Sequence, residues 1–194
     1  MDDPGWQGSA RTQAFLGPDG VSPARPYSEA RLVWGDGHLY LGLYAADEDI
    51  RVKGTEHDAP VAGDDFFHVV FSDGETDRVI DVSPTGIVTD GTRRAGSNAS
   101  LDLGWESHAH VSVERDGTPN DPRDLDEEWV IEMAIPLAAL GLRGEKGEAI
   151  GLSLRRCDTL RTGVTLCGSW GEGAATAESI DAAGAAKKGV ILLD

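Results

Sequence analysis

The sequence predicts an all-β protein, an antiparallel β-sandwich with one short helix. Short apolar runs recur along the 194 residues, and turn-forming residues such as Gly, Pro, Asp and Ser separate them. Within residues 127–135, Trp129, Ile131, Met133 and Ile135 alternate with a second set of side chains, which is the period of a half-buried strand. Together these two observations indicate a sandwich built from short antiparallel strands.

The one helix that we expect follows this strand. Pro136 lacks a backbone donor and should therefore end the strand pairing. The apolar residues 137–142 can then form one or two helical turns, closed by Gly141 or Gly144. The result is a short helix after Ile135-Pro136 that covers one end of the β fold.

The other elements follow in chain order from alternation and turn residues. Residues 1–30 are rich in Gly, Pro and Ser, and we expect Trp6 and Phe15 to anchor this irregular arm on the core. Residues 31–46 read as a hairpin, because two apolar strands flank Gly35-Asp36-Gly37. The further strands are expected at residues 66–71, 78–83, 87–89, 111–115, 149–157, 164–170 and 190–193. Loops are expected at residues 47–63, 90–104 and 116–128, and a weakly structured stretch at 171–186.

Composition limits the classes of partner. The chain is long enough for one domain with a real core, and we assign residues 1–194 to a single domain. No run of about 18 apolar residues is present, so no membrane span is expected. The net charge of −17 disfavours nucleic acid and anionic lipid, whereas neutral sugars and Ca²⁺ remain compatible with it. The alternative is that the acidity serves solubility alone.

Two cysteines face each other in the late hairpin. Cys157 and Cys167 lie on either side of a turn near Thr162-Gly163, so the two thiols should meet across an antiparallel strand pair. We therefore predict a Cys157–Cys167 disulfide and, from it, an exported protein that is secreted or periplasmic. The first four residues are acidic and polar, so the leader of an exported protein would be missing from this sequence. The alternative is two reduced thiols, buried separately.

No catalytic motif stands out. The chain has no Gly-x-Ser-x-Gly, no phosphate-binding loop, no His-Glu-x-x-His and no cysteine pair with zinc spacing. Its five histidines are scattered, and His108 and His110, which share a strand face, are read as exposed strand residues. Carboxylates are so numerous that no single pair indicates a glycosidase. We therefore do not expect an enzyme.

The order of elements resembles carbohydrate-binding module family 9. The resemblance rests on DDPGW, RLVWGDGHLYLGLYAADEDI, GDDFFHVVF, RVIDVSPTGIVTDG, DEEWVIEMAIPLAALGL and IGLSLRRCD followed by SW. It covers nearly the whole chain and implies a sandwich that binds sugar, without catalysis, between two tryptophans assisted by charged residues. Trp170 corresponds to the later tryptophan. Residues 57–62, where the earlier one would lie, contain none, and the family's glutamate falls on His68.

The residues around His68 predict a ligand site as well. A turn near Gly74-Glu75 would bring His68 close to Asp81, with Phe67 on the opposite strand face. The resemblance adds Arg156 and Trp170 from neighbouring strands, and Trp105 follows the loop that ends at Gly104. Planar polar groups and an aromatic face suit a sugar. The predicted ligand-binding residues are His68, Arg78, Asp81, Trp105, Arg156 and Trp170. The alternative is a buried His–Asp–Arg network that stabilises the sandwich.

Two acidic loops are candidate sites for structural Ca²⁺, since hard cations prefer several oxygen ligands. One contains Asp47, Glu48 and Asp49. The expected metal ligands from both loops are Asp47, Asp49, Asp124 and Asp126. Neither loop has EF-hand spacing, and solvated acidic loops are the alternative reading. No cofactor is expected to be required.

The predicted function is lectin-like binding of a carbohydrate, either a glycan or a small polyhydroxylated ligand, by a monomer. A second candidate is a structural or protein-interaction sandwich that has lost the sugar site, which the missing loop tryptophan favours. The third is a haem-binding, cytochrome-like relative, which would need axial ligands such as methionine. Met133 shares its strand face with Trp129 and reads as core packing instead.

Overall fold

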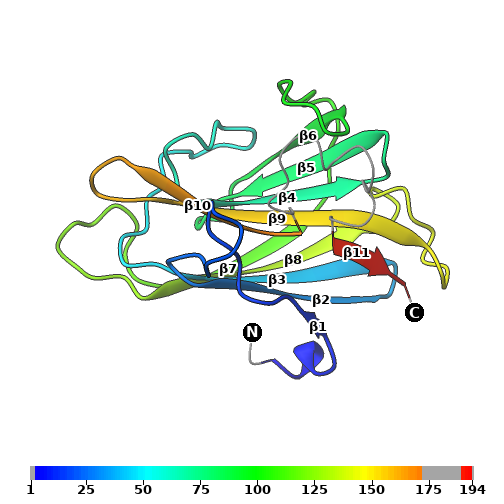
Figure 1. Ribbon diagram of the computed structural model, residues 1–194, viewed down its shortest axis with the longest axis horizontal. Helices are drawn as coiled ribbons and strands as arrows, with labels where there is room; N and C mark the ends of the chain where they lie inside the picture. Colours follow the sequence, from blue (N-terminus) through cyan, green and yellow to red (C-terminus); the bar gives the residue numbers. More distant parts are fainter. Residues whose placement is uncertain (1–2, 172–188, 194) are drawn as a thin grey trace.

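The protein is a sandwich of two antiparallel β-sheets (Figure 1). Its structure, a computed structural model, describes residues 3–171 and 189–193. Sheet A contains, in spatial order, β1 (Ala10–Arg11), β2 (Ser28–Gly35), β3 (His38–Ala46), β8 (Glu128–Pro136) and β7 (His110–Asp116). Sheet B contains β10 (Thr165–Trp170), β9 (Ala149–Thr159), β4 (Phe66–Ser72), β5 (Thr76–Val82) and β6 (Val88–Arg94), and β11 (Gly189–Leu192) also pairs with β9. The predicted antiparallel β-sandwich is thus confirmed.

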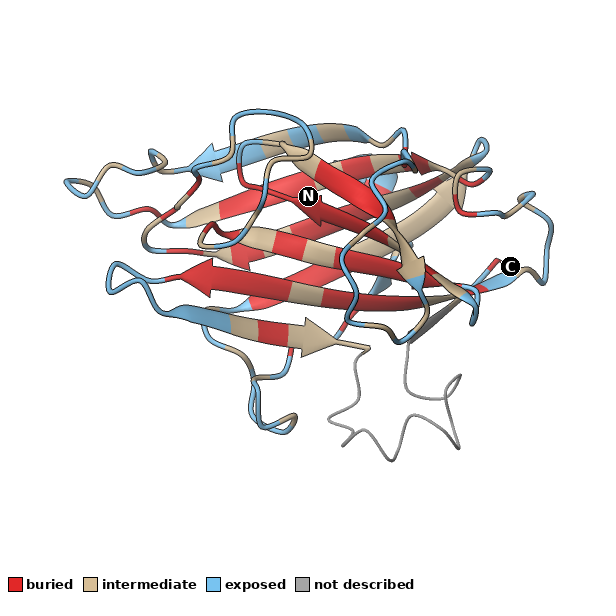
Figure 2. Cartoon of the chain, turned by 90° about the horizontal axis from the view of Figure 1, so that it is seen from above, coloured by how far each residue is buried: buried red, intermediate tan, exposed pale blue. Residues whose placement is uncertain are grey.

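The β2–β3 hairpin forms where the turn residues placed it. Asp36 and Gly37 both have positive φ, 49° and 76°, which matches a tight two-residue hairpin turn. On β3, Leu39, Leu41 and Leu43 are buried with at most 1% of their surface exposed. Figure 2 shows that buried and less buried positions alternate along the strands of the sandwich.

Aromatic and aliphatic side chains from both sheets fill the space between them. Trp129 from β8 packs against Phe67 from β4, with 5.0 Å between the ring centroids, and Phe67 also contacts Phe15. Met133 is buried in the same cluster, in agreement with its predicted core role. Trp6 packs at the outer side of sheet A, where its Nε1 donates to Glu132 Oε1 at 2.7 Å. Phe15 thus anchors the amino-terminal arm on the core as predicted, whereas Trp6, which was also expected on the core, holds the arm on the outer side of sheet A instead.

The short helix expected after Pro136 is replaced by consecutive turns. Leu140 N donates to Leu137 O at 3.0 Å, and Leu142 N donates to the same oxygen at 2.9 Å. Gly141 has a φ of 78°, in the left-handed region, and so ends the turn-forming segment. The segment before it is too short to offset the free-energy cost of helix nucleation. Leu137 and Leu140 are nevertheless buried and close one end of the core. Among the described residues, the one helix is the 3₁₀ turn η1 (Pro4–Trp6).

Strand β6 is longer than the sequence predicted. Residues 90–94 were expected in a loop, but they pair with β5, for example Asp90 with Ile80. Gly91 allows the following segment to pass close to the sheet, because a Cβ at this position would lie 2.7 Å from the carbonyl oxygen of Asp102. Tertiary pairing therefore overrides the loop-like composition of this stretch.

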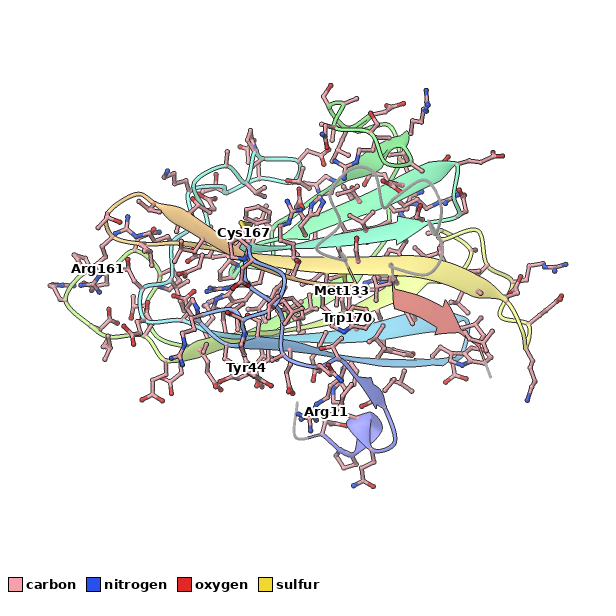
Figure 3. The ribbon with its side chains drawn as sticks, viewed as in Figure 1. Arg11, Tyr44, Met133, Arg161, Cys167 and Trp170 are labelled. Atoms are coloured by element: carbon pink, nitrogen blue, oxygen red, sulfur yellow. A yellow bond between two sulfur atoms is a disulfide. The ribbon has the colours of Figure 1, made fainter. Side chains whose placement is uncertain are left out.

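The disulfide links β9 to β10. Cys157 lies directly opposite Cys167 in the strand register, and their Cα atoms are 4.2 Å apart. Figure 3 shows Cys167 where β10 crosses beside β9. The predicted closing strand is confirmed as β11, whereas the stretch predicted as weakly structured lies almost wholly outside the described residues. In the part of the chain that is described, no helix is long and apolar enough to cross a membrane.

Candidate functional site

Strand alternation gives sheet B two chemically different faces. On β4, Phe67, Val69 and Phe71 point into the core and are fully buried. Phe66, His68 and Val70 therefore lie on the opposite, outer face. This outer face is the candidate ligand-binding surface, because the predicted His68–Asp81 pair lies on it.

Polar side chains from five adjacent strands meet in one row across this face. The strand register places them side by side in the order Thr89, Asp81, His68, Arg155 and Ser169, which we call the polar row. His68 Nδ1 is hydrogen-bonded to Asp81 Oδ1 at 2.5 Å, as the hairpin geometry predicted. The row combines a carboxylate, an imidazole, a guanidinium and two hydroxyls. Thr89, at one end, is buried and its hydroxyl donates to Ala59 O at 2.6 Å, so the other four residues supply the donors and acceptors for a polar ligand.

Apolar groups lie on either side of the polar row. Val70 and Val79 are paired one step along the strands, on the same face as His68. Phe66 lies one step in the other direction and is half-buried. Val70 and Val79 are buried, with 3% and 0% of their surface exposed, so Phe66 is the apolar neighbour of the row that stays partly accessible to the C–H surface of a sugar.

Arg156 does not share this face. It lies opposite Phe67 in the register, and 2% of its surface is exposed. Its Nη2 contacts Asp47 Oδ2 at 2.6 Å and Asp158 Oδ1 at 3.0 Å. Since side chains alternate along β9, Arg155 takes the place beside His68 that the sequence analysis gave to Arg156.

Three other predicted ligand residues also lie away from the polar row. Trp170 is paired with Leu154, so it faces the layer between the sheets, where Figure 3 shows it, and packs against the core. Trp105 is half-buried and packs against the core too. Arg78 forms an ion pair with Asp73 at 2.9 Å and lies near the turns after β8. Of the six predicted residues, the structure brings together His68 and Asp81.

Arg156 lies at the centre of a buried group of carboxylates, which we call the interior cluster: Asp47, Asp65, Asp158 and Arg156. The three carboxylates offer oxygens within 4.8 Å of one another. Burial, together with the negative charge of Asp47, raises the pKa of Asp65 to about 8. Burial also raises the pKa of Asp158. The guanidinium of Arg156 therefore balances negative charge that the carboxylates of the interior cluster would otherwise concentrate in the core.

The predicted calcium ligands do not gather into one ligand set among the described residues. They are Asp47, Asp49, Asp124 and Asp126. The Asp47 carboxylate is held by Arg156 and by the indole N–H of Trp129. Asp49 forms ion pairs with two arginines, and Asp126 accepts two backbone N–H groups. Calcium binding by these loops remains a prediction.

A second cluster lies at the open edge of the sandwich, between β6 and β7. A hollow of about 340 Å³ there is lined by apolar residues of both strands, such as Val88 and Val111. His57, Asp90 and Glu106 contribute polar groups, with ligand atoms within 4.8 Å of one another. This cluster was not predicted from the sequence, because its three residues come from separate segments and no metal-binding motif links them. His57 does lie in the loop where the family resemblance places a tryptophan.

Comparison with solved structures supports the fold. A Bacteroides uniformis protein to which carbohydrate binding is ascribed is 16% identical, with a TM-score of 0.62 over 84% of this chain and 78% of that one. A family 9 carbohydrate-binding module from Caldicellulosiruptor kristjanssonii is 12% identical. Its glucose complex has a TM-score of 0.61 over 100% of this chain and 88% of that one. Its cellotriose complex has a TM-score of 0.55 over 87% and 76%. No protein-family model and no curated protein sequence matches the chain. The chain therefore has a fold like that of carbohydrate-binding module family 9, as its resemblance implied.

Proposed function

We propose that this domain is a non-catalytic carbohydrate-binding module of an exported protein, and that its sugar site is the outer face of sheet B. The observation that carries the proposal is the polar row, in which Asp81, His68 and Arg155 lie side by side on three adjacent strands. The fold shared with modules solved in complex with glucose and cellotriose supports a ligand of the same chemical class.

The chemistry of the row suits neighbouring hydroxyl groups. Arg155 can donate to two oxygens at once, and the imidazole of His68, oriented by Asp81, presents its second ring nitrogen to a ligand. The C–H surface of a sugar ring can pack on Phe66, which is partly exposed. Neutral sugars also avoid the repulsion that the net charge of −17 imposes on anions.

The disulfide supports an exported location. Disulfides persist in secreted and periplasmic proteins and are rare where thiols are kept reduced. Cys157–Cys167 crosses the two strands that carry Arg155 and Ser169, so it also stabilises the proposed binding face.

A glycan array followed by calorimetry tests the proposal. We expect the wild type to bind a neutral glycan, and Arg155→Ala to weaken binding by about 10- to 100-fold, because hydrogen bonds to charged groups contribute about 1.5–3 kcal/mol. Arg94→Ala, an exposed arginine on β6 of the same sheet, is the matched control and should bind like the wild type. Each titration is repeated with Ca²⁺ and with a chelator, which tests the predicted calcium dependence.

Trp170→Ala separates this site from the family's tryptophan clamp. Because Trp170 faces the layer between the sheets, the variant should keep its affinity as long as its circular dichroism is unchanged. Loss of binding in folded Trp170→Ala, with Arg155→Ala unaffected, would move the site to Trp170 and contradict the proposal.

A structural or protein-binding sandwich is the second candidate. The observation in its favour is that neither Trp105 nor Trp170 reaches the outer face of sheet B, so the described residues form no tryptophan clamp there. Absence of wild-type binding across a broad glycan array would favour this function over the first.

A further inference from the structure

Three carboxylates converge on one imidazole at the open edge of the sandwich. His57 Nε2 lies 3.1 Å from Glu106 Oε2, 3.7 Å from Asp58 Oδ1 and 3.8 Å from Asp90 Oδ1. We call these four residues the edge cluster. They come from the loop before β4, from β6 and from the segment before β7, so the fold brings together groups that are up to 49 residues apart.

Asp90 shows that the cluster is incomplete. Its side chain is 2% exposed, and its Oδ1 atom is buried without any hydrogen-bond partner. The other oxygen, Oδ2, accepts the backbone N–H of Ser107 at 2.7 Å, which fixes the orientation of the carboxylate and directs Oδ1 toward His57. A buried carboxylate oxygen that lacks a partner is costly, and a bound cation is one way in which proteins satisfy it.

The charges of the cluster lead to the same conclusion. When the His57 imidazole is neutral, the carboxylates of Asp58, Asp90 and Glu106 carry a total formal charge of −3 around His57 Nε2. A single protonated histidine would neutralise one of these charges and leave the other two in mutual repulsion. A divalent cation among the four side chains would neutralise two charges and supply the missing partner of Asp90.

The donor set also restricts the type of metal. In tetrahedral zinc sites with bonds of about 2.0–2.2 Å, neighbouring ligand atoms are about 3.3–3.6 Å apart. The separations from His57 Nε2 to Glu106 Oε2 and to Asp90 Oδ1, 3.1 and 3.8 Å, bracket this value. Ca²⁺ and Mg²⁺ prefer all-oxygen sites, whereas an imidazole nitrogen with carboxylate oxygens suits Zn²⁺ and neighbouring transition metals.

We propose that His57, Asp90 and Glu106 form a binding site for a transition-metal dication, Zn²⁺ in the first instance, with a water as the fourth ligand and Asp58 beside the site. The ion cross-links the loop before β4 to β6 and to the segment before β7, and so closes the edge at which the two sheets are not hydrogen-bonded to each other. His57 and Glu106 are about half exposed at the hollow, which gives the ion a route of entry and leaves room for a water ligand. The site adjoins the end of the polar row, since Thr89 precedes Asp90 on β6 and donates to Ala59 O, but it contains none of the residues of the row.

Titration of the metal-free protein with Zn²⁺, in competition with a chromophoric chelator, tests the site. We expect one Zn²⁺ per chain, bound more tightly than Ca²⁺, and at least about 100-fold weaker binding by His57→Ala, because loss of a ligand costs more than loss of its outer-shell partner. His110→Ala removes an exposed histidine from β7 and serves as the control with unchanged affinity. Co²⁺ in place of Zn²⁺ should give the visible spectrum of a four-coordinate site.

Two further variants keep the test decisive. Asp90→Asn preserves shape and removes the orphan charge, and exposed Glu106→Gln removes a ligand with little risk to folding; both should weaken Zn²⁺ binding as His57→Ala does. Equal Zn²⁺ affinity in the wild type, His57→Ala and Glu106→Gln would overturn the proposal. Tighter binding of Ca²⁺ than of Zn²⁺ by the wild type would overturn the assignment of the metal.

Discussion

The interior cluster and the edge cluster have similar components but opposite surroundings. Each gathers three carboxylates around one basic side chain. In the interior cluster the base is Arg156, whose side chain is 3% exposed, whereas in the edge cluster it is His57, whose side chain is 52% exposed. Arginine is permanently charged and binds no metal, but a neutral imidazole is a metal ligand. We infer that the basic side chain at the centre, Arg156 or His57, decides whether a carboxylate cluster stabilises the fold or binds an ion.

Arg156→Met should produce the largest effect and would separate the two roles. The substitution keeps apolar bulk but leaves the buried carboxylates of Asp47 and Asp158 without their cation, which typically costs about 3–5 kcal/mol. Urea unfolding measures the loss. Arg155→Met, at the neighbouring position on the opposite face of β9, is the control and should cost less than about 1 kcal/mol. Similar losses in both variants would show that Arg156 is not the structural centre of the interior cluster.

This pair of arginines also shows what the sequence could predict. Alternation and turn residues predicted the hairpins, the core side chains of β3 and β8, and the contact between His68 and Asp81. The alternation of Ile150, Leu152 and Leu154 points Arg156 inward, but hydropathy alone treats both consecutive arginines as surface residues. The register, with Arg156 opposite Phe67, follows the alternation. Of the carboxylates that make this buried arginine tolerable, Asp158 is two residues away, whereas Asp47 lies far from it in the sequence.

The edge cluster was inaccessible to sequence reasoning for a related reason. His57 and Glu106 lie on loops, where no period links sequence to position, and they meet because the chain folds back along β6. The short helix after Pro136 illustrates a local limit. An apolar run ending at glycine is compatible with both a helical turn and consecutive β-turns, and its length decided in favour of turns.

Removal of the disulfide should have the next largest effect and tests whether the two clusters are independent of each other. Cys157 lies between Arg156 and Asp158 on β9, so the covalent link supports the strand that carries the interior cluster. The Cys157→Ala/Cys167→Ala variant should lose about 2–3 kcal/mol of unfolding free energy, the amount expected for a closed loop of about ten residues. Its Zn²⁺ affinity at the edge cluster should not change, because no member of that cluster lies on β9 or β10. A parallel loss of Zn²⁺ binding in the folded variant would show that the two clusters are coupled.

The pH response should distinguish the clusters by sign. Burial raises the folded-state pKa of Asp65 to about 8, so its contribution to stability is fully present below the unfolded pKa of about 3.9 and is lost as the pH rises through 8. Between pH 6 and 7 the unfolding free energy should fall by at most about 1.4 kcal/mol per proton, and Asp65→Asn should flatten this slope. The Arg78 guanidinium lowers the pKa of Asp73 to about 2, so that carboxylate affects stability at a much lower pH and does not interfere.

Zn²⁺ affinity at the edge cluster should rise with pH, because metal ligands bind in their deprotonated forms and binding releases protons. Calorimetry at pH 6 and 7 in two buffers of different ionisation enthalpy measures both the affinity and the number of protons released. The same pH change would then weaken the cluster built on arginine and strengthen the one built on histidine, and two pH slopes of the same sign would contradict the distinction between them.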